Sequence, residues 1–286
     1  MNSELETKKV YARALDPIHI GAGGYRLGRV DNTIVRDPAT DVPKIPGTSI
    51  AGVFRAFAEI VKDINTEDVF GTESKKGILQ FYDGQIIFFP VSSIHGTVWI
   101  TTKELLEYWF GEMKNGEKIK IPKNVEDAAY IIKWDKDSKP SFLNLGWLLL
   151  EVENPDGKEI ALPQEIVNWV KRIVIVSDKL FSHIVNDNLE VRTSVRIDPK
   201  TGTAAEGALF TYEAIPRGTV LGFEIGVDKA LAKQRGIDAD IIVSTIISGV
   251  SPFLRNLGIG GMATRGFGRL EIALKSENGG EKNAQS

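Results

Sequence analysis

Two hydrophobic periodicities follow one another in the first part of the chain. Residues 8–20 alternate between apolar and polar side chains, which predicts a strand that runs into a loop. Residues 46–63 have helical spacing instead, with Thr48 or Ser49 as the predicted N-terminal cap. The apolar positions of this helix are Ile50, Val53, Phe54, Phe57, Ile60 and Val61.

The next segments predict a hairpin, a short helix and an irregular stretch. Residues 77–91 are largely apolar around Asp83-Gly84, which predicts a hairpin that turns at this dipeptide. Residues 102–113 predict a short helix. From about residue 115 to residue 171 the periodicity is weak, and we interpret this stretch as an insertion rather than a second domain.

The second half of the chain contains a long predicted hairpin, a helix and a final strand. Residues 192–197 and 209–215 have strand patterns, and residues 198–202 form a turn sequence between them. This connection is long for a simple hairpin, so we expect it to project from the body. Residues 238–250 predict a helix, and residues 265–275 alternate into a strand. The helix face expected to be apolar contains Ile241, Ile242, Thr245 and Ile246.

The order of these elements predicts the fold class. Strand, helix, hairpin, long middle, helix and strand match the β-α-β-β-α-β order of a ferredoxin-like fold. The sequence therefore predicts an α+β protein in which residues 1–275 form one domain, a ferredoxin-like (RRM-like) palm with the insertion at about 115–171. A hairpin at about 191–216 should project from it as a thumb. Residues 276–286 are polar, which predicts a disordered tail.

Composition limits the possible chemistry and location. The 286 residues are 42% hydrophobic, enough for a sizeable core, and include no cysteine. The lack of cysteine excludes disulfides, thiol catalysis and cysteine-ligated zinc, and it fits a reducing cytoplasm. The charged N-terminal residues are not typical of a secretory signal, and no apolar run approaches the roughly 20 residues of a membrane helix. We therefore expect a cytoplasmic protein without a membrane partner.

The distribution of charge is more informative than its sum. The net charge of −3 argues weakly against nucleic acid as a partner. However, residues 241–270 contain no acid but three arginines, Arg255, Arg265 and Arg269. Further cations of the N-terminal part are Arg26, Arg29, Arg36, Lys44 and Arg55. Local charge therefore keeps nucleic acid binding open, with ordinary mixing of surface charge as the alternative.

Residues 17–36 surround a single acid, Asp31, with glycines and arginines. The three histidines have no metal-ligand spacing, and His19 alone is more typical of packing than of metal binding. The chain also lacks a G-x-S-x-G nucleophile and an aspartate cluster for two metals. Cleavage of RNA requires fewer catalytic residues from the protein, because the 2′-hydroxyl of RNA is a built-in nucleophile that one carboxylate can assist, with or without a metal.

Two further segments could bind phosphate. Residues 258–268 match the dinucleotide fingerprint at Gly258, Gly260 and Ala263, but that fingerprint follows a strand and opens a helix, and here the predicted order is reversed. We interpret the segment as a glycine-rich loop whose amides approach a phosphate, with a flexible turn as the alternative. The start of the helix at residues 46–63 predicts a second anion site.

Several motifs together resemble the RAMP superfamily of CRISPR systems. Residues 17–23, 43–55 and 258–268 occur in that family's order, and a glycine-rich loop before the last strand is its hallmark. Residues 27–37, 84–96 and 196–216 resemble more narrowly the backbone subunits of type III-B Cmr effector complexes, the family of the fourth Cmr protein. The resemblance extends from about Tyr11 to Leu274.

This resemblance implies a function. Such subunits stack into a filament along the CRISPR RNA together with other Cmr subunits, and they cut bound single-stranded target RNA with a divalent metal, Mg or Mn. The family's catalytic aspartate lies in the motif LGxVD, which here implies Asp31 as the catalytic residue and metal ligand. The implied RNA-binding residues are His19, Gly21, Gly23, Arg26, Arg29, Lys44, Thr48, Ser49, Arg55, Arg192, Arg196, Gly260, Gly261, Met262, Arg265 and Gly266.

Two departures from the family pattern keep alternatives open. The family often has SLKG at residues 49–52 and RSLKG at residues 92–96, whereas this chain has SIAG and SSIHG and so lacks basic residues there. A non-catalytic RNA-binding scaffold is the main alternative, followed by a nuclease that processes CRISPR RNA and a small-molecule enzyme. For Asp31, the structural alternative is an ion pair with Arg26, Arg29 or Arg36.

Overall fold

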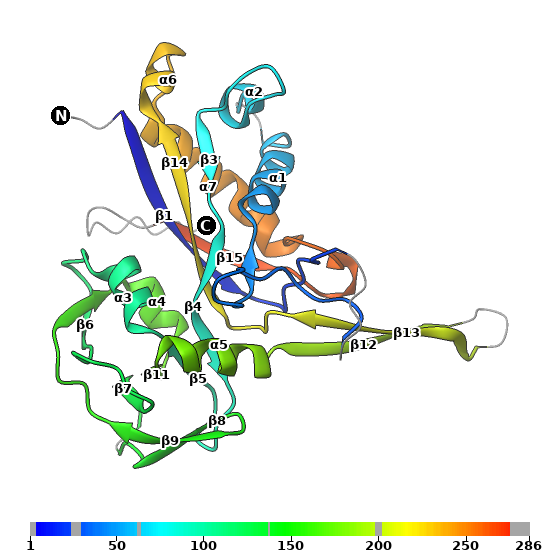
Figure 1. Ribbon diagram of the computed structural model, residues 1–286. Coiled ribbons are helices and arrows are strands. Elements are labelled where there is room, and N and C mark those ends of the chain that lie inside the picture. Colours follow the sequence, from blue (N-terminus) through cyan, green and yellow to red (C-terminus); the bar gives the residue numbers. More distant parts are fainter. Residues whose placement is uncertain (1–3, 24–29, 62–63, 137, 198–201, 275–286) are drawn as a thin grey trace.

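The computed structural model describes residues 4–23, 30–61, 64–136, 138–197 and 202–274. It has a mixed α+β fold built on a large mixed sheet of eleven strands, with two further two-stranded sheets (Figure 1). The main path of the large sheet is β15-β1-β14-β4-β5-β11-β7-β9-β8. No helix within the described ranges is long and apolar enough to cross a membrane.

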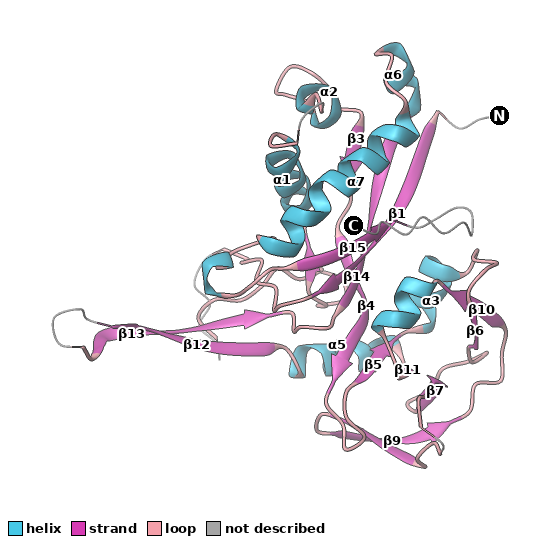
Figure 2. Ribbon diagram, turned by 180° about the vertical axis from the view of Figure 1, so that it is seen from behind, coloured by secondary structure: helices cyan, strands magenta, loops and turns pink. Residues whose placement is uncertain are grey.

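Four antiparallel neighbours form one end of the large sheet. In spatial order they are β15 (Leu270–Leu274), β1 (Leu5–Ala14), β14 (Val220–Asp228) and β4 (Gly84–Val91). Helix α1 (Gly47–Ala58) lies between β1 and β4 in the chain, and α7 (Ala239–Asn256) lies between β14 and β15. Both helices pack on the same face of the strands (Figure 2), and the ring of Phe57 from α1 stacks on that of Phe253 from α7 with their centres 5.2 Å apart. The chain order of β1, α1, β4, β14, α7 and β15 is thus strand, helix, strand, strand, helix and strand, but its two middle strands are β4 and β14 and not the hairpin predicted over residues 77–91.

The start of α1 differs from the prediction, because neither Thr48 nor Ser49 caps it. The Gly47 N–H instead donates to Asp83 Oδ1 at 2.7 Å, so a side chain distant in sequence satisfies this helix end. Gly47 is needed here because a Cβ atom would lie 2.3 Å from the Phe81 carbonyl oxygen. Tertiary contact therefore replaces the local cap.

The hairpin predicted at Asp83-Gly84 is wrong. Strands β3 (Leu79–Phe81) and β4 both pair antiparallel with β14, one after the other along its length. The dipeptide is thus a break between two consecutive strand segments, and Asp83 caps α1. Strand β2 (Lys44–Ile45) pairs with β4, and helix α2 (Thr66–Phe70) precedes β3.

The apolar face predicted for α7 is found only in part, since Ile246 is buried and Ile242 packs against the core. Ile241 is 63% exposed, and the helix runs on to Asn256 through Pro252. Its buried side chains are Val243, Ile246, Ile247, Val250 and Leu254. These positions follow helical spacing along the 18-residue helix. Helix α6 (Lys229–Gln234) precedes α7.

The predicted insertion continues the sheet on its other side. Beyond β4 lie β5 (Val98–Thr101), β11 (Ile173–Ile175) and then three strands of the insertion. The insertion itself contains β6 (Glu117–Lys120), β7 (Ala129–Lys133), β8 (Phe142–Leu145), β9 (Leu148–Glu153), β10 (Glu159–Leu162) and α4 (Gln164–Trp169). Residues of β6, β7, β10 and α4 form a second core with α3 (Lys103–Phe110), around Trp109 and Phe110, whereas the buried residues of β8 and β9 belong to the first core. That residues 1–275 form a single domain stays a prediction.

A two-stranded hairpin follows helix α5 (Asp178–Asp187). Strands β12 (Glu190–Ile197) and β13 (Ala204–Ala214) pair with each other from Glu190↔Ala214 to Ile197↔Ala204. Both views show this pair extending away from the rest of the molecule (Figures 1 and 2). Residues 198–201 of the predicted turn and the tail at 276–286 lie outside the described residues.

Candidate nucleic-acid interface

Three predicted motifs meet at the base of the β12–β13 hairpin. The first segment reaches it through Ile18, which exchanges two backbone hydrogen bonds with Ile215 at 2.9 Å each. Residues 31–35 run beside the free edge of β13, where Asn32 N–H donates to the Thr211 carbonyl at 3.1 Å. The glycine-rich loop closes on the same place, because Gly261 N–H donates to the His19 carbonyl at 2.9 Å. Segments almost 250 residues apart in the chain are thus assembled around one strand.

The Asp31 carboxylate is bound to β13. Its Oδ2 accepts hydrogen bonds from the Thr211 N–H and the Thr211 hydroxyl, both at 2.8 Å. The Asp31 N–H in turn donates to Thr211 Oγ1 at 2.9 Å. The Thr211 amide, followed by its hydroxyl, holds the pKa of Asp31 below its usual range, so the carboxylate is ionised at neutral pH. Within the described residues, Oδ1 has no hydrogen-bond partner and remains available.

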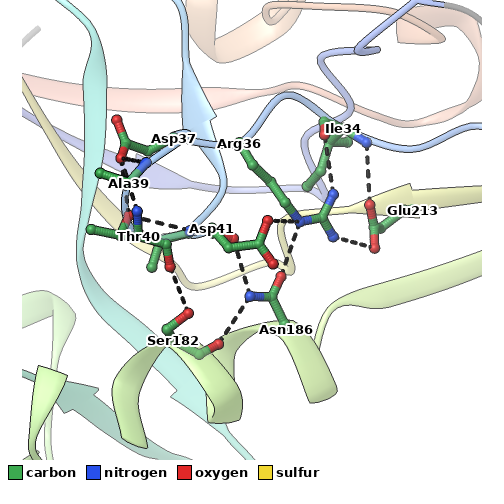
Figure 3. Close-up of polar contacts among 10 residues, drawn as sticks. Ile34, Arg36, Asp37, Ala39, Thr40, Asp41, Ser182, Asn186 and Glu213 are labelled. Atoms are coloured by element: carbon green, nitrogen blue, oxygen red, sulfur yellow. Dashed lines mark hydrogen bonds and ion pairs between the residues drawn. The ribbon is translucent and has the colours of Figure 1, made fainter. Parts of the chain in front are cut away.

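Arg36 does not pair with Asp31, so the alternative in which these two residues form an ion pair is wrong. Its guanidinium lies 2.6 Å from Glu213 Oε1, and its Nε donates to Asn186 Oδ1 of α5 at 3.0 Å. Glu213 also accepts from the Ile34 N–H at 3.2 Å and is only 8% exposed. Figure 3 shows Arg36 between the segment from Ile34 to Asp41, helix α5 and β13. This buried pair holds the Asp31 segment against the hairpin.

The opposite face of β13 carries the cations. Arg265 of the glycine-rich loop donates to the Tyr212 hydroxyl at 3.3 Å, and the Arg192 guanidinium lies 4.8 Å from the centre of the Phe267 ring. Both arginines are exposed. Because successive side chains of a strand point to opposite faces, Tyr212 and its arginine neighbour face away from the Thr211–Asp31 side. The site is therefore two-sided, with a carboxylate face and an arginine face.

His19 is a structural residue at the centre of this base. It is 7% exposed, its ring meets Tyr212 edge-on at 5.8 Å, and its Nδ1 donates to the Glu213 carbonyl at 2.7 Å. Gly21 lies close to its ring, since a Cβ atom on Gly21 would be 3.3 Å from His19 Nε2. These contacts fix the orientation of the His19 ring within this base.

The glycine-rich loop requires glycine where it crosses the first segment. Gly260 has a φ of +86°, and a Cβ atom there would lie 2.6 Å from the His19 carbonyl oxygen. Met262 adopts φ 63°, and a short 3-10 turn, Ala263–Arg265, leads to Gly266 at φ +77°. The loop thus follows a helix and precedes a strand, as the rejection of the dinucleotide fingerprint requires.

A substitution at Gly260 tests this close approach. We expect Gly260→Ala to lower the free energy of unfolding by about 3 kcal/mol, because left-handed strain adds to a backbone clash. Gly266→Ala is the matched control, since Gly266 has similar φ but nothing within 4 Å of the added Cβ. It should lose only about 1 kcal/mol. Urea denaturation measures both, and equal losses would contradict the packing argument.

The remaining implied RNA-binding residues lie elsewhere or outside the described residues. The Lys44 ammonium lies 2.7 Å from Asp83, and Arg55 donates to the Gly71 carbonyl at 2.9 Å. Thr48 and Ser49 lie in the first turn of α1, where the Asp83 carboxylate already accepts an amide hydrogen bond. The anion site predicted at this helix end is therefore occupied by a protein carboxylate. Arg26 and Arg29 lie outside the described residues, as does the Arg196 side chain, while Gly23 is exposed with φ +73°.

A divalent metal fits this site only in part. The described residues contain no group of three or more His, Asp or Glu side chains that could hold a metal. Asp31 offers one ionised carboxylate, whose Oδ1 has no hydrogen-bond partner in the described ranges. Mg²⁺ in nucleotide-processing sites is often held by one or two carboxylates, with water and substrate phosphates completing the shell. Among the described residues, Asp31 could therefore hold a metal only together with RNA and water.

Two residues at this base had been given no role by the sequence, Thr211 and Glu213. The local signal for them is the alternation in residues 209–215, which places both on one face of a strand with Tyr212 on the other. Their partners, Asp31 and Arg36, lie 180 and 177 residues away. Sequence spacing alone therefore cannot pair them.

Comparison with known proteins agrees with this geometry. The model of the RAMP superfamily matches residues 11–271. The CRISPR system Cmr endoribonuclease Cmr4 of Pyrococcus furiosus is 29% identical over 297 residues, which cover 93% of this chain and 95% of that protein.

Solved structures share the fold. A type III-B Cmr-beta complex bound to cognate target RNA contains a chain that matches with a TM-score of 0.70 at 20% identity, over 94% of this chain and 97% of that one. Oligomeric Cmr4 from Pyrococcus furiosus matches with a TM-score of 0.65 at 22% identity, over 94% and 99%. At these identities the likeness establishes the mixed α+β fold.

Proposed function

The chain belongs to the RAMP superfamily, and we propose that it is a backbone subunit of a type III-B CRISPR effector filament that binds CRISPR RNA and cleaves guide-matched target RNA. One observation carries this proposal. The segment at residues 17–23, the Asp31 segment and the glycine-rich loop converge on the hairpin base. There an ionised Asp31, whose Oδ1 has no hydrogen-bond partner among the described residues, lies on one face, and exposed arginines lie on the other.

We assign the two parts of the fold to the two parts of such a subunit. The strand order β15-β1-β14-β4, all antiparallel, with α1 and α7 as crossovers, supports a ferredoxin-like palm. The β12–β13 hairpin is the proposed thumb, supported by its separate two-stranded sheet. The partners proposed for the whole subunit are CRISPR RNA, single-stranded target RNA, further copies of the chain and other Cmr subunits. The proposed location is the cytoplasm.

The chemistry assigned to the site is cleavage by the RNA itself. The 2′-hydroxyl oxygen attacks the adjacent phosphorus and loses its proton to solvent, the bond from phosphorus to the 5′-oxygen breaks, and that oxygen takes a proton from water. Arg265, Arg192 and the amides of the glycine-rich loop would hold the phosphate backbone. A bound Mg²⁺ or Mn²⁺ would stabilise charge on the phosphate. Because its pKa is lowered, Asp31 is a weak proton acceptor, which favours a metal-ligand role over general-base catalysis.

Cleavage by the reconstituted complex tests this function. The complex is assembled with a guide of defined sequence and given a labelled matched target, with Mg²⁺, with Mn²⁺ or with a chelator. We expect cutting at regular intervals with either metal and none with the chelator. A mismatched target is the control for guide dependence. Target that binds tightly but stays intact under all conditions would overturn the catalytic proposal.

One observation favours the second candidate, a non-catalytic scaffold. Asp31 makes three hydrogen bonds with Thr211, which is also what a purely structural acid would do. In that case the same reconstituted complex would bind guide and target without cutting either.

Phosphate binding by the arginine face gives a further prediction. We expect Arg265→Ala to weaken binding of single-stranded RNA to the purified chain by a similar factor for all sequences. The slope of log K against log salt should become shallower by about 0.7, the value for one lost phosphate contact on a single strand. Lys158→Ala is the control, since Lys158 lies in the insertion, where it forms a surface ion pair with Glu107 of α3. An unchanged slope in Arg265→Ala would argue against a phosphate contact.

A further inference from the structure

We propose that Thr211 is a positioning residue that fixes the Asp31 carboxylate, so that Oδ1 alone faces the RNA. This inference rests on the proposed function, because it assumes that Asp31 takes part in cleavage. It assigns to the hairpin strand a direct part in arranging the reactive group, in addition to contacting RNA.

The geometry of the pair carries the inference. The Thr211 hydroxyl donates to Asp31 Oδ2 at 2.8 Å and accepts from the Asp31 N–H at 2.9 Å. The Thr211 N–H donates to the same Oδ2 at 2.8 Å. A single residue thus binds both the backbone and one carboxylate oxygen of Asp31. These contacts resist rotation of the carboxylate and leave Oδ1 as its only oxygen without a partner in the described part of the chain.

Thr211 is itself held firmly. Its strand pairs with β12 on one edge, where Thr193 is its partner, and with the Asp31 segment on the other, where Asn32 N–H donates to the Thr211 carbonyl at 3.1 Å. A β-branched side chain in a strand also has few accessible rotamers. The position of the hairpin therefore determines the position of the carboxylate, through the hydrogen bonds from the Thr211 N–H and hydroxyl to Asp31 Oδ2.

Replacing the hydroxyl tests this role. Thr211→Val keeps shape and branching but removes both hydroxyl bonds, whereas Thr211→Ser keeps the hydroxyl. Thr193→Val is the matched control, because Thr193 is exposed and lies directly across the hairpin from Thr211. Each variant is assembled into the guide-bound complex, and the single-turnover cleavage rate and the half-saturating concentration of complex are measured separately.

We expect Thr211→Val to lower the single-turnover rate about tenfold or more, since small misplacements of a reacting group are costly. The half-saturating concentration should stay within about twofold, because the phosphate contacts assigned to the arginine face are intact. Thr211→Ser should restore most of the rate, and Thr193→Val should match the unmodified protein. Amide hydrogen exchange supplies a readout independent of activity: the peptide over residues 30–34 should exchange faster in Thr211→Val only, because the Asp31 N–H loses its acceptor.

The outcomes separate this inference from the proposed function. Unchanged cleavage and exchange in Thr211→Val, while Asp31→Asn is inactive, would overturn the role of Thr211 alone. Equal losses of rate and affinity in Thr211→Val would also overturn it, since that pattern belongs to a general structural role. Full cleavage by Asp31→Asn would instead overturn the catalytic assignment on which the inference rests. Thr211→Ala repeats the test if the valine variant fails to assemble.

Discussion

Asp31→Asn is expected to cut guide-matched RNA about 10² to 10⁴ times more slowly than the unmodified chain, the usual scale for a lost acid–base or charged catalytic group. The structure indicates that this substitution is mild in other respects. The amide oxygen of asparagine can accept the same two hydrogen bonds from Thr211, at the position that Oδ2 now holds. The change therefore removes the charge and one free carboxylate oxygen while the Asp31 segment stays attached to β13.

Assembly and target affinity should hardly change in Asp31→Asn, because the arginine face makes the proposed phosphate contacts. Affinity could rise slightly through the loss of repulsion between the acid and the phosphates. Asp156→Asn is a suitable control, since Asp156 is also a surface carboxylate with a lowered pKa that accepts a backbone hydrogen bond, from Lys123, but lies in the insertion. Cleavage rate at saturating Mg²⁺ or Mn²⁺ and target affinity are measured on one preparation. Full activity of Asp31→Asn would leave the RNA-binding scaffold as the better interpretation.

Segments with sustained periodicity were predictable from the sequence. The helical spacing of α1 reflects the burial of one helix face, so the local pattern predicts it directly. The alternation of β1 was also sufficient to predict a strand, although Tyr11 on its second face is buried as well. The order of these elements was sufficient to place both ends of the chain in one sheet, where β15 pairs with β1. The hairpin of β12 and β13 was likewise visible, because each strand has a strand-like composition and a turn sequence lies between them.

Features decided by distant residues were not predictable. The break at Asp83-Gly84 has the sequence of a turn, but Asp83 accepts a hydrogen bond from the first amide of α1. Strand β14 is also long enough to pair with the strand segments on both sides of the break. The first turn of α7 has apolar residues, yet Ile241 faces solvent because burial follows the stripe of the whole helix. In each case a tertiary contact overrides a local preference.

The candidate site shows the same division. Motif order named Asp31, His19 and the glycine-rich loop, and the structure brings these three to one place. The sequence could not indicate that Asp31 and Arg265 lie on opposite faces of β13, because that depends on which edge of the strand the Asp31 segment joins. One alternative that the sequence left open paired Arg36 with Asp31, whereas the buried Glu213 carboxylate binds Arg36.

The Arg36–Glu213 pair should be a major source of stability at the hairpin base. We expect Arg36→Met to lower the free energy of unfolding by about 3 kcal/mol, because it leaves Glu213 buried without its partner. The effect should be that large because Glu213 is only 8% exposed and its other hydrogen bond, from the Ile34 N–H, does not balance its charge. Urea denaturation of the purified chain measures the loss.

Two comparisons separate the buried charge from the lost side chain. Arg255→Met removes an arginine whose ion pair with Glu271 is at the surface, with side chains 64% and 30% exposed, and should cost less than about 1 kcal/mol. The double variant Arg36→Met, Glu213→Gln should recover part of the stability, because the unpaired buried charge is gone. A cost for Arg36→Met no greater than that for Arg255→Met would show that water reaches Glu213 easily. If the cost is large, the segment that carries Asp31 is held to helix α5 and strand β13 by this pair, and cleavage should fall together with stability in Arg36→Met but not in Arg255→Met.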